Sequence, residues 1–307
     1  MPGLLSLDDL TAEDLHAIVD RAARVLDADR PLAPQLSGRV LGIYFAKTST
    51  RTRTAFSSAA LRLGASLIQY GPNDLQLNTG ESLEDTGRMF AAMLDGLVAR
   101  TAGPLADLRL LSEAGGLPVV NAMAAEEHPT QGLCDAATLQ RHFGRVDGLS
   151  VLYVGEGNNS ATALGKVLRA YKGVTLVLAT PRGYGVPADV VTALQAAAAE
   201  TDSRVEQVHD LAEAELDADV VYTTRWQTTG TVKPDADWRE LFRPFHVDEA
   251  LMACWPRAVF MHDLPAHRGE EVASSVLDGE RSLAWEQARM KYGSAVAVLE
   301  WLFGERG

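Results

Sequence analysis

The 307-residue chain has few cysteines, few basic residues and no long apolar run, and each shortage excludes a class of protein. Cys134 and Cys254 lie far apart without CxxC or His-x-x-x-His spacing, which argues against a disulfide framework or a zinc site. The net charge of -13 is unsuited to a general nucleic-acid or anionic-membrane binder. No apolar run approaches the roughly 20 residues of a membrane span, and the acidic N-terminus does not resemble a signal peptide. We therefore expect a cytoplasmic protein without nucleic-acid or membrane partners.

What the chain does contain is a regular alternation of apolar, strand-like runs with segments of helical periodicity. This alternation is typical of α/β proteins with parallel sheets, and 307 residues suffice for two domains of about 150 residues. We expect one sheet in domain 1–145, a doubly wound sheet in domain 146–282, and a C-terminal helix, 283–304, that packs back on the first domain. The expected strands are 40–45, 66–69, 96–99, 118–121, 150–155, 174–179, 205–208, 220–223 and 258–262.

Residues 49–53, Ser-Thr-Arg-Thr-Arg, place two guanidinium groups and three hydroxyl groups between a predicted strand and a predicted helix. Backbone N–H groups at a helix start, together with the positive end of the helix dipole, favour an anion at such a junction. Ordinary helix capping would account for one or two of these residues but not for all five. The motif therefore predicts an anion site suited to phosphate.

Further polar residues follow other predicted strands at their carboxyl ends, which is where open α/β sheets bind ligands. Arg100 ends the third strand, residues 128–131 (His-Pro-Thr-Gln) follow the fourth, and residues 262–265 (His-Asp-Leu-Pro) end the ninth. Taken singly, His128 is explained as a helix cap and Arg100 as a surface arginine. Taken together, these residues predict a ligand site.

Together these motifs resemble the aspartate/ornithine carbamoyltransferase family. The resemblance spans nearly the whole chain, in the family's order and spacing, and five motifs in register are more specific than any one of them. It implies the two-domain carbamoyltransferase fold and a reaction in which an amine attacks carbamoyl phosphate without a metal or organic cofactor. The matching segments are Ser49–Arg53 with Phe56, Gly80–Thr86, His128–Gln131 with Asp135, His262–Val272, and Arg289-Met290.

The resemblance also implies a role for each residue of a carbamoyl phosphate site. Ser49, Thr50, Arg51 and Thr52 would hold the phosphate through backbone N–H groups, hydroxyls and a bidentate guanidinium. Arg100 would bridge the phosphate and the carbonyl oxygen, on which negative charge grows during the reaction.

The carbamoyl end of the substrate would be held by residues from the later motifs. His128 would donate a hydrogen bond to the carbonyl oxygen, while Gln131 and the backbone carbonyl of Leu264 would bind the carbamoyl NH2 group. Arg289 on the returning helix would close over this end. The expected catalytic residues are Arg51, Arg100, His128 and Asp263.

The segment 72–82 resembles the loop that relatives insert into the active site of a neighbouring subunit, which implies a homotrimer with shared sites. Gln76, Asn78 and Thr79 would be its contact residues. Aspartate enzymes carry a lysine just before the Gly-Glu pair at 80–81, whereas this chain has Asn78-Thr79. An ordinary solvated loop is the alternative explanation.

The acceptor side combines features of both branches of the family. Residues 155–159 (Gly-Glu-Gly-Asn-Asn) resemble the ornithine branch, which makes Asn158 and Asn159 expected acceptor-binding residues. At 223–230, however, Thr-Thr-Arg-Trp-Gln-Thr-Thr-Gly replaces the Asp-x-x-x-Ser-Met-Gly pattern of that branch. Arg225 and Gln227 instead resemble the aspartate-branch pair that grips a substrate carboxylate.

Asp263 occupies a position at which ornithine enzymes carry Cys and aspartate enzymes carry Pro. Its carboxylate would attract a cationic acceptor or relay a proton, unless it merely pairs with His267 or Arg268 outside the pocket. A pocket lined by Asp263 and Arg225 suits L-ornithine, which would give citrulline and phosphate. A shorter diamino acid, aspartate and putrescine are the alternative acceptors.

Three other classes of function are weaker. Gly155-x-Gly157 after a strand suggests a dinucleotide-dependent dehydrogenase, but Ser160 stands at the third glycine position and no acid follows the next strand. A catalytically inactive regulatory subunit would be expected to lack some of the residues assigned to carbamoyl phosphate, and all are present. A different acyl donor would not need Gln131 and Leu264.

Overall fold

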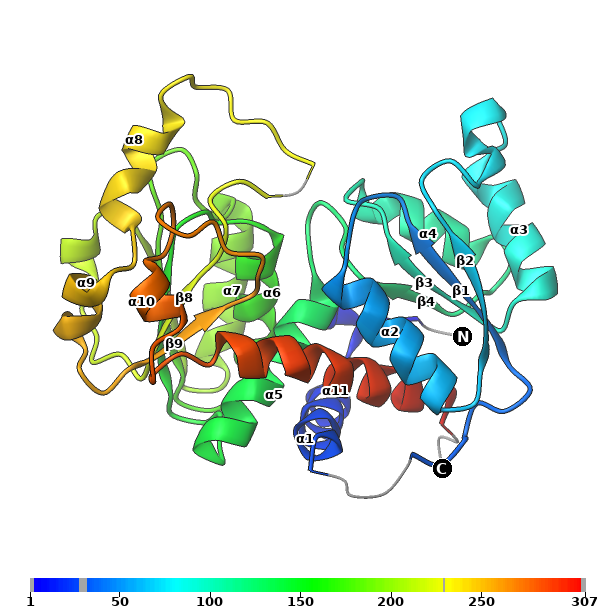
Figure 1. Ribbon diagram of the computed structural model, residues 1–307, viewed down its shortest axis with the longest axis horizontal. Helices are drawn as coiled ribbons and strands as arrows, with labels where there is room; N and C mark the ends of the chain where they lie inside the picture. Colours follow the sequence, from blue (N-terminus) through cyan, green and yellow to red (C-terminus); the bar gives the residue numbers. More distant parts are fainter. Residues whose placement is uncertain (1–2, 28–31, 229, 305–307) are drawn as a thin grey trace. The chain divides into compact units, whose positions relative to one another are not determined.

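The computed structural model describes residues 3–27, 32–228 and 230–304, and the chain divides into two compact units. Unit 1 comprises residues 1–137 and 289–307, and unit 2 comprises residues 138–288. Each unit contains one parallel sheet flanked by helices, which confirms the expected fold class (Figure 1). The division points fall inside α5 (Pro129–Phe143) and α11 (Ala284–Phe303). The functional domain limits at 145 and 283 stay a prediction.

The sheet of unit 1 has the strand order β2-β1-β3-β4, with all neighbours parallel. β1 pairs with β2 on one side and with β3 on the other, so the direction of winding reverses between β1 and β3, where α/β sheets open a ligand crevice. The strands are β1 (Val40–Phe45), β2 (Ser66–Tyr70), β3 (Gly96–Arg100) and β4 (Val119–Asn121). The helices of unit 1 are η1 (Leu7–Asp9), α1 (Ala12–Val25), α2 (Arg51–Arg62), η2 (Gln76–Thr79), α3 (Leu83–Met93) and α4 (Leu105–Glu113), with parts of α5 and α11.

The sheet of unit 2 has the doubly wound order β7-β6-β5-β8-β9, and its winding reverses between β5 and β8. Its strands are β5 (Ser150–Val154), β6 (Thr175–Ala179), β7 (Arg204–Val208), β8 (Val220–Thr223) and β9 (Val259–His262). The helices are α6 (Asn159–Leu168), α7 (Ala188–Ala199), η3 (Leu211–Glu213), α8 (Trp238–Phe242), η4 (Arg243–Phe245), α9 (Glu249–Cys254) and α10 (Ser274–Leu277). All nine expected strands are therefore present in the two sheets.

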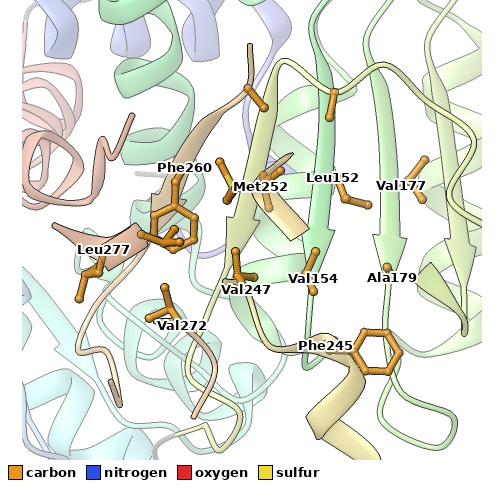
Figure 2. Packing of buried hydrophobic residues seen from close by; sticks show 14 of the residues in the cluster. Leu152, Val154, Val177, Ala179, Phe245, Val247, Met252, Phe260, Val272 and Leu277 are labelled. Carbon is orange, nitrogen blue, oxygen red and sulfur yellow. The ribbon is translucent and has the colours of Figure 1, made fainter. Parts of the chain in front are cut away.

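Buried apolar side chains form a core within each unit. In unit 1, Phe90, Leu97 and Val119 are at most 1% exposed and belong to one cluster. In unit 2, Leu152 of β5 and Phe260 of β9 belong to a cluster that runs across the sheet (Figure 2). Central parallel strands are covered on both faces, which explains why they read as nearly continuous apolar runs in the sequence. None of the helices in the described ranges has the length and apolar character to cross a bilayer.

Candidate active site

In unit 1, the turn between β1 and α2 provides the start of a helix that is not capped by its own side chain. Thr50 is the N-cap residue, with φ -80° and ψ -57°, and its side chain makes no capping hydrogen bond. No acidic residue lies in the first turn. The first backbone N–H groups of an α-helix have no partner within the helix, so this turn suits an anion. Ser49 to Thr52 thus lie where the sequence predicts an anion site.

The two arginines of this motif have different surroundings. Arg51 opens α2, whereas Arg53 directs its guanidinium over the ring of Phe45, 5.2 Å from the centroid. Arg53 also donates from Nη2 to the backbone carbonyl of Tyr70, at 3.4 Å. Arg53 therefore packs against the ends of β1 and β2, whereas Arg51 is the first residue of α2.

His128 lies between β4 and α5 and is 5% exposed. Its Nε2 is 3.4 Å from Nη1 of Arg100 at the end of β3, and its Nδ1 is 3.3 Å from the Thr130 hydroxyl. Burial lowers the pKa of His128 well below its usual range, and the positive charges of Arg100 and Lys291 lower it further. His128 is therefore neutral at neutral pH.

The loop that carries His128 is held by the N-terminal segment. Glu127, which is 1% exposed, accepts hydrogen bonds from the backbone N–H of Leu7 at 2.7 Å and from the hydroxyl of Ser6 at 2.6 Å. Asn121 at the end of β4 donates to the backbone carbonyl of Leu5 at 2.9 Å. The position of His128 therefore depends on a segment more than a hundred residues away in the sequence.

Gln131 is 1% exposed and lies beside a lysine that sequence reasoning missed. Its Nε2 donates to Oδ1 of Asp135 at 2.7 Å, and its Oε1 accepts a hydrogen bond from Nζ of Lys291 on α11. Gln131 and Lys291 line a cavity of about 10 Å³ together with Thr52, Phe56, His128 and Ser294. Lys291 lies between two buried residues of α11, Met290 and Ser294. This position on the buried face of a helix is what could have identified Lys291. Arg289, the predicted contact, is exposed on the same helix.

In unit 2, the turn between β5 and α6 is closed by its own side chains. Asn158 caps α6, since its Oδ1 accepts from the backbone N–H groups of Ser160 at 2.9 Å and Ala161 at 3.2 Å. Asn159 is the first residue of the helix and is 6% exposed. A Cβ on Gly157 would lie 2.1 Å from the backbone nitrogen of Val186, so this glycine is required for close packing. Because Asn158 already takes the donors that a dinucleotide phosphate would use, the dehydrogenase alternative loses its main support.

Arg225 and Gln227 follow β8 within one loop. Nε of Arg225 donates to the backbone carbonyl of Gln227 at 2.7 Å, and Nε2 of Gln227 donates to the carbonyl of Thr231 at 2.9 Å. Trp226 between them is buried and packs on Phe242, with ring centroids 5.6 Å apart. The two predicted acceptor residues are therefore brought together by the fold.

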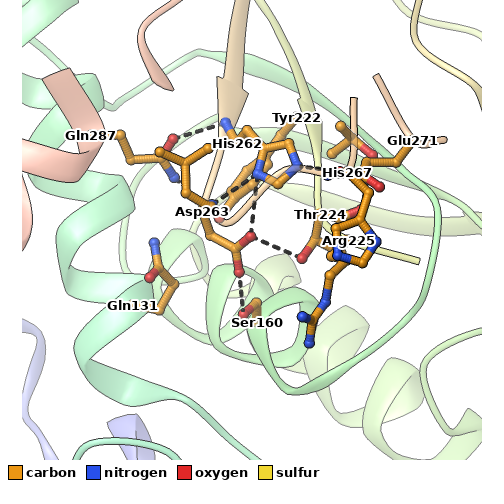
Figure 3. A network of polar contacts seen from close by, with 12 residues as sticks. Gln131, Ser160, Tyr222, Thr224, Arg225, His262, Asp263, His267, Glu271 and Gln287 are labelled. Carbon is orange, nitrogen blue, oxygen red and sulfur yellow. Dashed lines mark hydrogen bonds and ion pairs between the residues drawn. The ribbon is translucent and has the colours of Figure 1, made fainter. Parts of the chain in front are cut away.

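Asp263 at the end of β9 lies in a polar network of unit 2 (Figure 3). Its Oδ2 accepts from the hydroxyl of Ser160 at 3.0 Å and its Oδ1 from the hydroxyl of Thr224 at 2.9 Å. Asp263 thus joins the carboxyl ends of β5, β8 and β9. The alternative that it pairs with His267 or Arg268 is wrong, because these residues contact Glu270 and Asp278, respectively.

Leu264 has an unusual backbone conformation beside this network. Its φ of +53° lies in the left-handed region that side chains disfavour, and its N–H donates to Nδ1 of the buried His262 at 2.8 Å. Since Nδ1 accepts, the ring proton lies on Nε2, which is 3.1 Å from Oε1 of Glu271. Residues held in such conformations cluster at ligand sites. The role of Leu264 at the carbamoyl NH2 group stays a prediction.

The predicted neighbour-subunit loop is organised by local contacts. The hydroxyl of Thr79 donates to the carbonyl of Gln76 at 2.8 Å, and Nδ2 of Asn78 donates to the carbonyl of Pro72 at 3.4 Å. All three predicted contact residues are exposed, while Leu75 is buried and anchors the loop. The loop therefore presents its polar groups outward.

Among residues 3–27, 32–228 and 230–304, one group of side chains has metal-ligand spacing. His267, Glu270 and Glu271 have ligand atoms within 4.8 Å of one another. Glu271 accepts the N–H of His267 at 2.5 Å in addition to its contact with His262, so internal hydrogen bonds account for the group.

Comparison with known proteins accounts for these strand-end motifs in both units. The model of the aspartate/ornithine carbamoyltransferase carbamoyl-P binding domain matches residues 3–141, and that of the Asp/Orn binding domain matches residues 147–302. Ornithine carbamoyltransferase of Gloeobacter violaceus is 37% identical over 99% of this chain and 96% of its own length. The anabolic ornithine carbamoyltransferase of Pyrococcus furiosus is 36% identical, over 98% of this chain and 96% of its own.

The solved structures agree with the sequence comparison. Ornithine carbamoyltransferase from Pyrococcus furiosus superposes with a TM-score of 0.92 at 35% identity, covering 100% of this chain and 98% of that chain. The Gloeobacter violaceus enzyme gives a TM-score of 0.87 at 34% identity, with 99% of both chains covered. Two matched domains, full-length relatives and a common fold all lead to one conclusion: the chain belongs to the aspartate/ornithine carbamoyltransferase family.

Proposed function

We propose that the protein transfers the carbamoyl group of carbamoyl phosphate to the side-chain amine of L-ornithine, giving citrulline and phosphate. The observation that carries this proposal is the cluster in unit 1 formed by a neutral, buried His128 with Arg100, Gln131 and Lys291. It combines cationic groups for a phosphate with neutral donors and acceptors for an amide-like end. The names of the full-length relatives support ornithine as the acceptor.

In the proposed reaction, the phosphate binds at the first turn of α2, where Ser49 to Thr52 supply N–H groups, hydroxyls and the guanidinium of Arg51. The amine attacks the carbonyl carbon, negative charge grows on the carbonyl oxygen, and the C–O bond to phosphate breaks. The departing phosphate is basic enough to take the proton that the amine loses. Catalysis then rests on positioning and on stabilisation of the developing charge.

His128 can serve the carbonyl oxygen only in one tautomer. Arg100 can only donate, so at the observed contact Nε2 of His128 accepts and Nδ1 carries the proton. For Nε2 to donate to the substrate, the proton has to move to Nε2 while Nδ1 accepts from the Thr130 hydroxyl. We infer that Arg100 turns toward the phosphate when it binds and so releases His128 for this role.

In unit 2, Asp263 and Arg225 provide opposite charges at the carboxyl ends of neighbouring strands, β9 and β8. A diamino acid carries an ammonium group for the first and a carboxylate for the second. Ser160 and Thr224 hold the Asp263 carboxylate by neutral hydroxyl groups, which leave its charge in place. Ornithine satisfies both groups.

One observation favours a second candidate, the carbamoylation of a different cationic amine. Asp263 brings a carboxylate to a position where ornithine enzymes carry Cys, as the resemblance implies. A shorter diamino acid or putrescine would also be attracted by this charge, whereas aspartate would be repelled by it.

The acceptor is tested by measuring phosphate and ureido product from carbamoyl phosphate with ornithine, diaminopropionate, lysine, putrescine and aspartate. We expect ornithine to give the highest kcat/KM and aspartate the lowest. A higher kcat/KM for another diamine would replace ornithine as the acceptor. No turnover with any amine would favour an inactive regulatory subunit and contradict the proposal.

The phosphate role of Arg51 is tested by Arg51→Ala. Loss of a charged, two-point hydrogen bond worth about 3 kcal/mol or more predicts a fall in kcat/KM for carbamoyl phosphate of roughly a hundredfold or more, with the fold intact. Arg62→Ala is the matched control, because Arg62 is exposed in the last turn of the same helix. Near-normal turnover of Arg51→Ala would refute the assignment.

Two further parts of the proposal rest on sequence reasoning. We infer a homotrimer from the exposed loop containing Gln76, Asn78 and Thr79, which resembles the loop shared between subunits in relatives. We place the reaction in the cytoplasm because two widely spaced cysteines fit reduced thiols.

A further inference from the structure

Lys233 is a buried lysine in the segment that follows β8, and its surroundings are unusual. Its side chain is 3% exposed, although lysines are almost never buried unless they are paired. Its Nζ contacts Oε1 of Glu156 and lies over three aromatic rings. The distances from Nζ to the ring centroids are 4.5 Å for Tyr184, 4.7 Å for Phe242 and 5.4 Å for Trp238.

Glu156 connects this lysine to the loop that carries the predicted acceptor residues. One carboxylate oxygen contacts Lys233, and the other, Oε2, accepts from the N–H of Thr228 at 3.0 Å and from its hydroxyl at 2.6 Å. Nδ2 of Asn158 donates to the same hydroxyl at 2.9 Å. Thr228 directly follows Gln227, so the contact fixes the end of the loop 224–228 against the turn between β5 and α6.

Stability alone does not explain a buried ion pair here. Removing an ammonium and a carboxylate from water costs several kcal/mol per ion, and apolar replacements of buried pairs are often neutral or stabilising. Burial lowers the pKa of Lys233, and the contact with Glu156 opposes this shift. What the pair does provide is one defined arrangement of side chains. Glu156 contacts both Lys233 and Thr228, and Thr228 in turn accepts a hydrogen bond from Asn158.

We propose that Glu156 and Lys233 are positioning residues that hold the loop 224–228 in the conformation in which Arg225 and Gln227 meet the acceptor. The inference rests on the proposed carbamoyltransferase function and extends it to acceptor selection. Neither residue touches substrate in this scheme; each acts through Thr228. Replacing them changes the use of the acceptor and leaves the binding of carbamoyl phosphate unchanged.

The kinetic test compares Lys233→Met, Glu156→Gln and the double variant with the wild-type enzyme. We expect the acceptor KM to rise roughly tenfold, the equivalent of about 1.4 kcal/mol, with the carbamoyl phosphate KM within about twofold of wild type. The double variant is expected to be no worse than the more affected single variant, because the residues act as a unit. Lys233→Arg, which keeps the charge, should recover much of the acceptor affinity.

Arg239→Met is the matched control. Its guanidinium also stacks on Trp238, 4.4 Å from the ring centroid, but its side chain is 58% exposed and pairs with Glu270. We expect an unchanged acceptor KM. An unchanged acceptor KM in Lys233→Met, or a parallel rise of both KM values, would overturn the proposal.

Two measurements keep the test decisive if Lys233→Met does not fold or the wild type does not turn over. Thr228→Val removes only the bridging hydroxyl, and it should raise the acceptor KM severalfold; no change would count against the proposal. Hydrogen exchange reports the loop directly, and the Thr228 amide should exchange faster in Glu156→Gln while β8 stays protected. Unchanged exchange overturns the positioning role, whereas a wild type without turnover contradicts only the proposed function.

Discussion

The carboxylate of Asp263 accepts hydrogen bonds from two hydroxyl groups, those of Ser160 and Thr224. Hydroxyl donors orient a carboxylate without cancelling its charge, so the group can still attract a cation. At this scale, Asp263 would give the proposed acceptor site a negative charge at a position where, as the resemblance implies, ornithine enzymes carry an uncharged Cys.

Asp263→Asn tests this role with a side chain of nearly the same shape. Loss of the negative charge should raise the KM of a cationic diamino acceptor roughly tenfold, because a charge-assisted contact worth about 1.5 kcal/mol or more is removed. Initial rates at varied acceptor concentration measure the effect. Asp278→Asn, which removes an exposed partner of Arg268, is the control. An acceptor KM equal to that of the control would place Asp263 outside the acceptor site.

His128 predicts a pH dependence of stability. Its pKa is lowered in the folded protein, so between that lowered value and its ordinary value near 6.5 the unfolded chain binds more protons than the folded one. The free energy of unfolding should therefore fall as the pH drops below about 6.5, by at most about 1.4 kcal/mol per pH unit from this group.

Urea unfolding of the wild type and of His128→Gln at about pH 7 and about pH 5.5 measures this difference. The variant should lose part of the pH dependence. His142→Gln, at an exposed position of α5, should keep all of it. Equal pH dependence in the wild type and His128→Gln would contradict the shift.

At the scale of elements, the N-terminal segment and the loop between β4 and α5 behave as one structure. Glu127 accepts from both the backbone N–H of Leu7 and the hydroxyl of Ser6, and it lies directly before His128. A change in this contact should therefore affect both stability and turnover.

Glu127→Gln converts one acceptor oxygen into a donor that faces a buried N–H or O–H group. We expect a loss of about 1–3 kcal/mol in the free energy of unfolding together with a lower kcat, since His128 is no longer held in place. Urea unfolding and steady-state kinetics measure the two effects. Glu126→Gln is the control on the same loop, where Glu126 accepts from the N–H of Leu105 at an exposed site. A stability loss without any change in kcat would separate this contact from the active site.

The sequence predicts elements better than it predicts contacts between them. All nine strands were located because central parallel strands are continuous apolar runs. α5 begins at Pro129, because proline suits the first helical position, where no backbone N–H donor is needed. Lys291 was missed because its partner Gln131 lies 160 residues away in the sequence.

The acceptor side shows the same limit. The acceptor role of Asn158 stays a prediction; its side chain also caps α6 and bonds to Thr228, contacts that a motif does not reveal. The pairing of Glu156 with Lys233 depends on the tertiary fold, because the two residues are 77 positions apart. Motifs indicate candidate positions, and only the packing of strands and loops shows which residues contact them.

At the scale of the whole molecule, an acidic protein carries a locally cationic cluster. The chain has a net charge of -13, yet Arg100 and Lys291 lie close enough to His128 to lower its pKa. The attraction of an anionic substrate is therefore local, and it should weaken little with salt when the charges are partly buried.

The predicted trimer can be tested by mixing subunits. Arg51→Ala chains and chains with Gln76, Asn78 and Thr79 all changed to Ala should each be poorly active. If a loop completes a neighbour's site, trimers formed from a mixture contain some sites with both wild-type parts, so activity should partly return. Light scattering should give three times the mass of the chain. A monomer, or a mixture without recovered activity, would contradict the shared site.

The first turn of α2 lacks a side-chain cap, and the proposed substrate carries a group that could replace one. A side chain can satisfy the first N–H groups of a helix, and here Thr50 does not do so. A bound phosphate would do so instead, and would thereby become the N-cap of α2. If the proposed site is right, the donor would supply hydrogen-bond acceptors to the first turn of α2 while it is bound, and the release of phosphate would remove them. Each turnover would then cap and uncap this helix once.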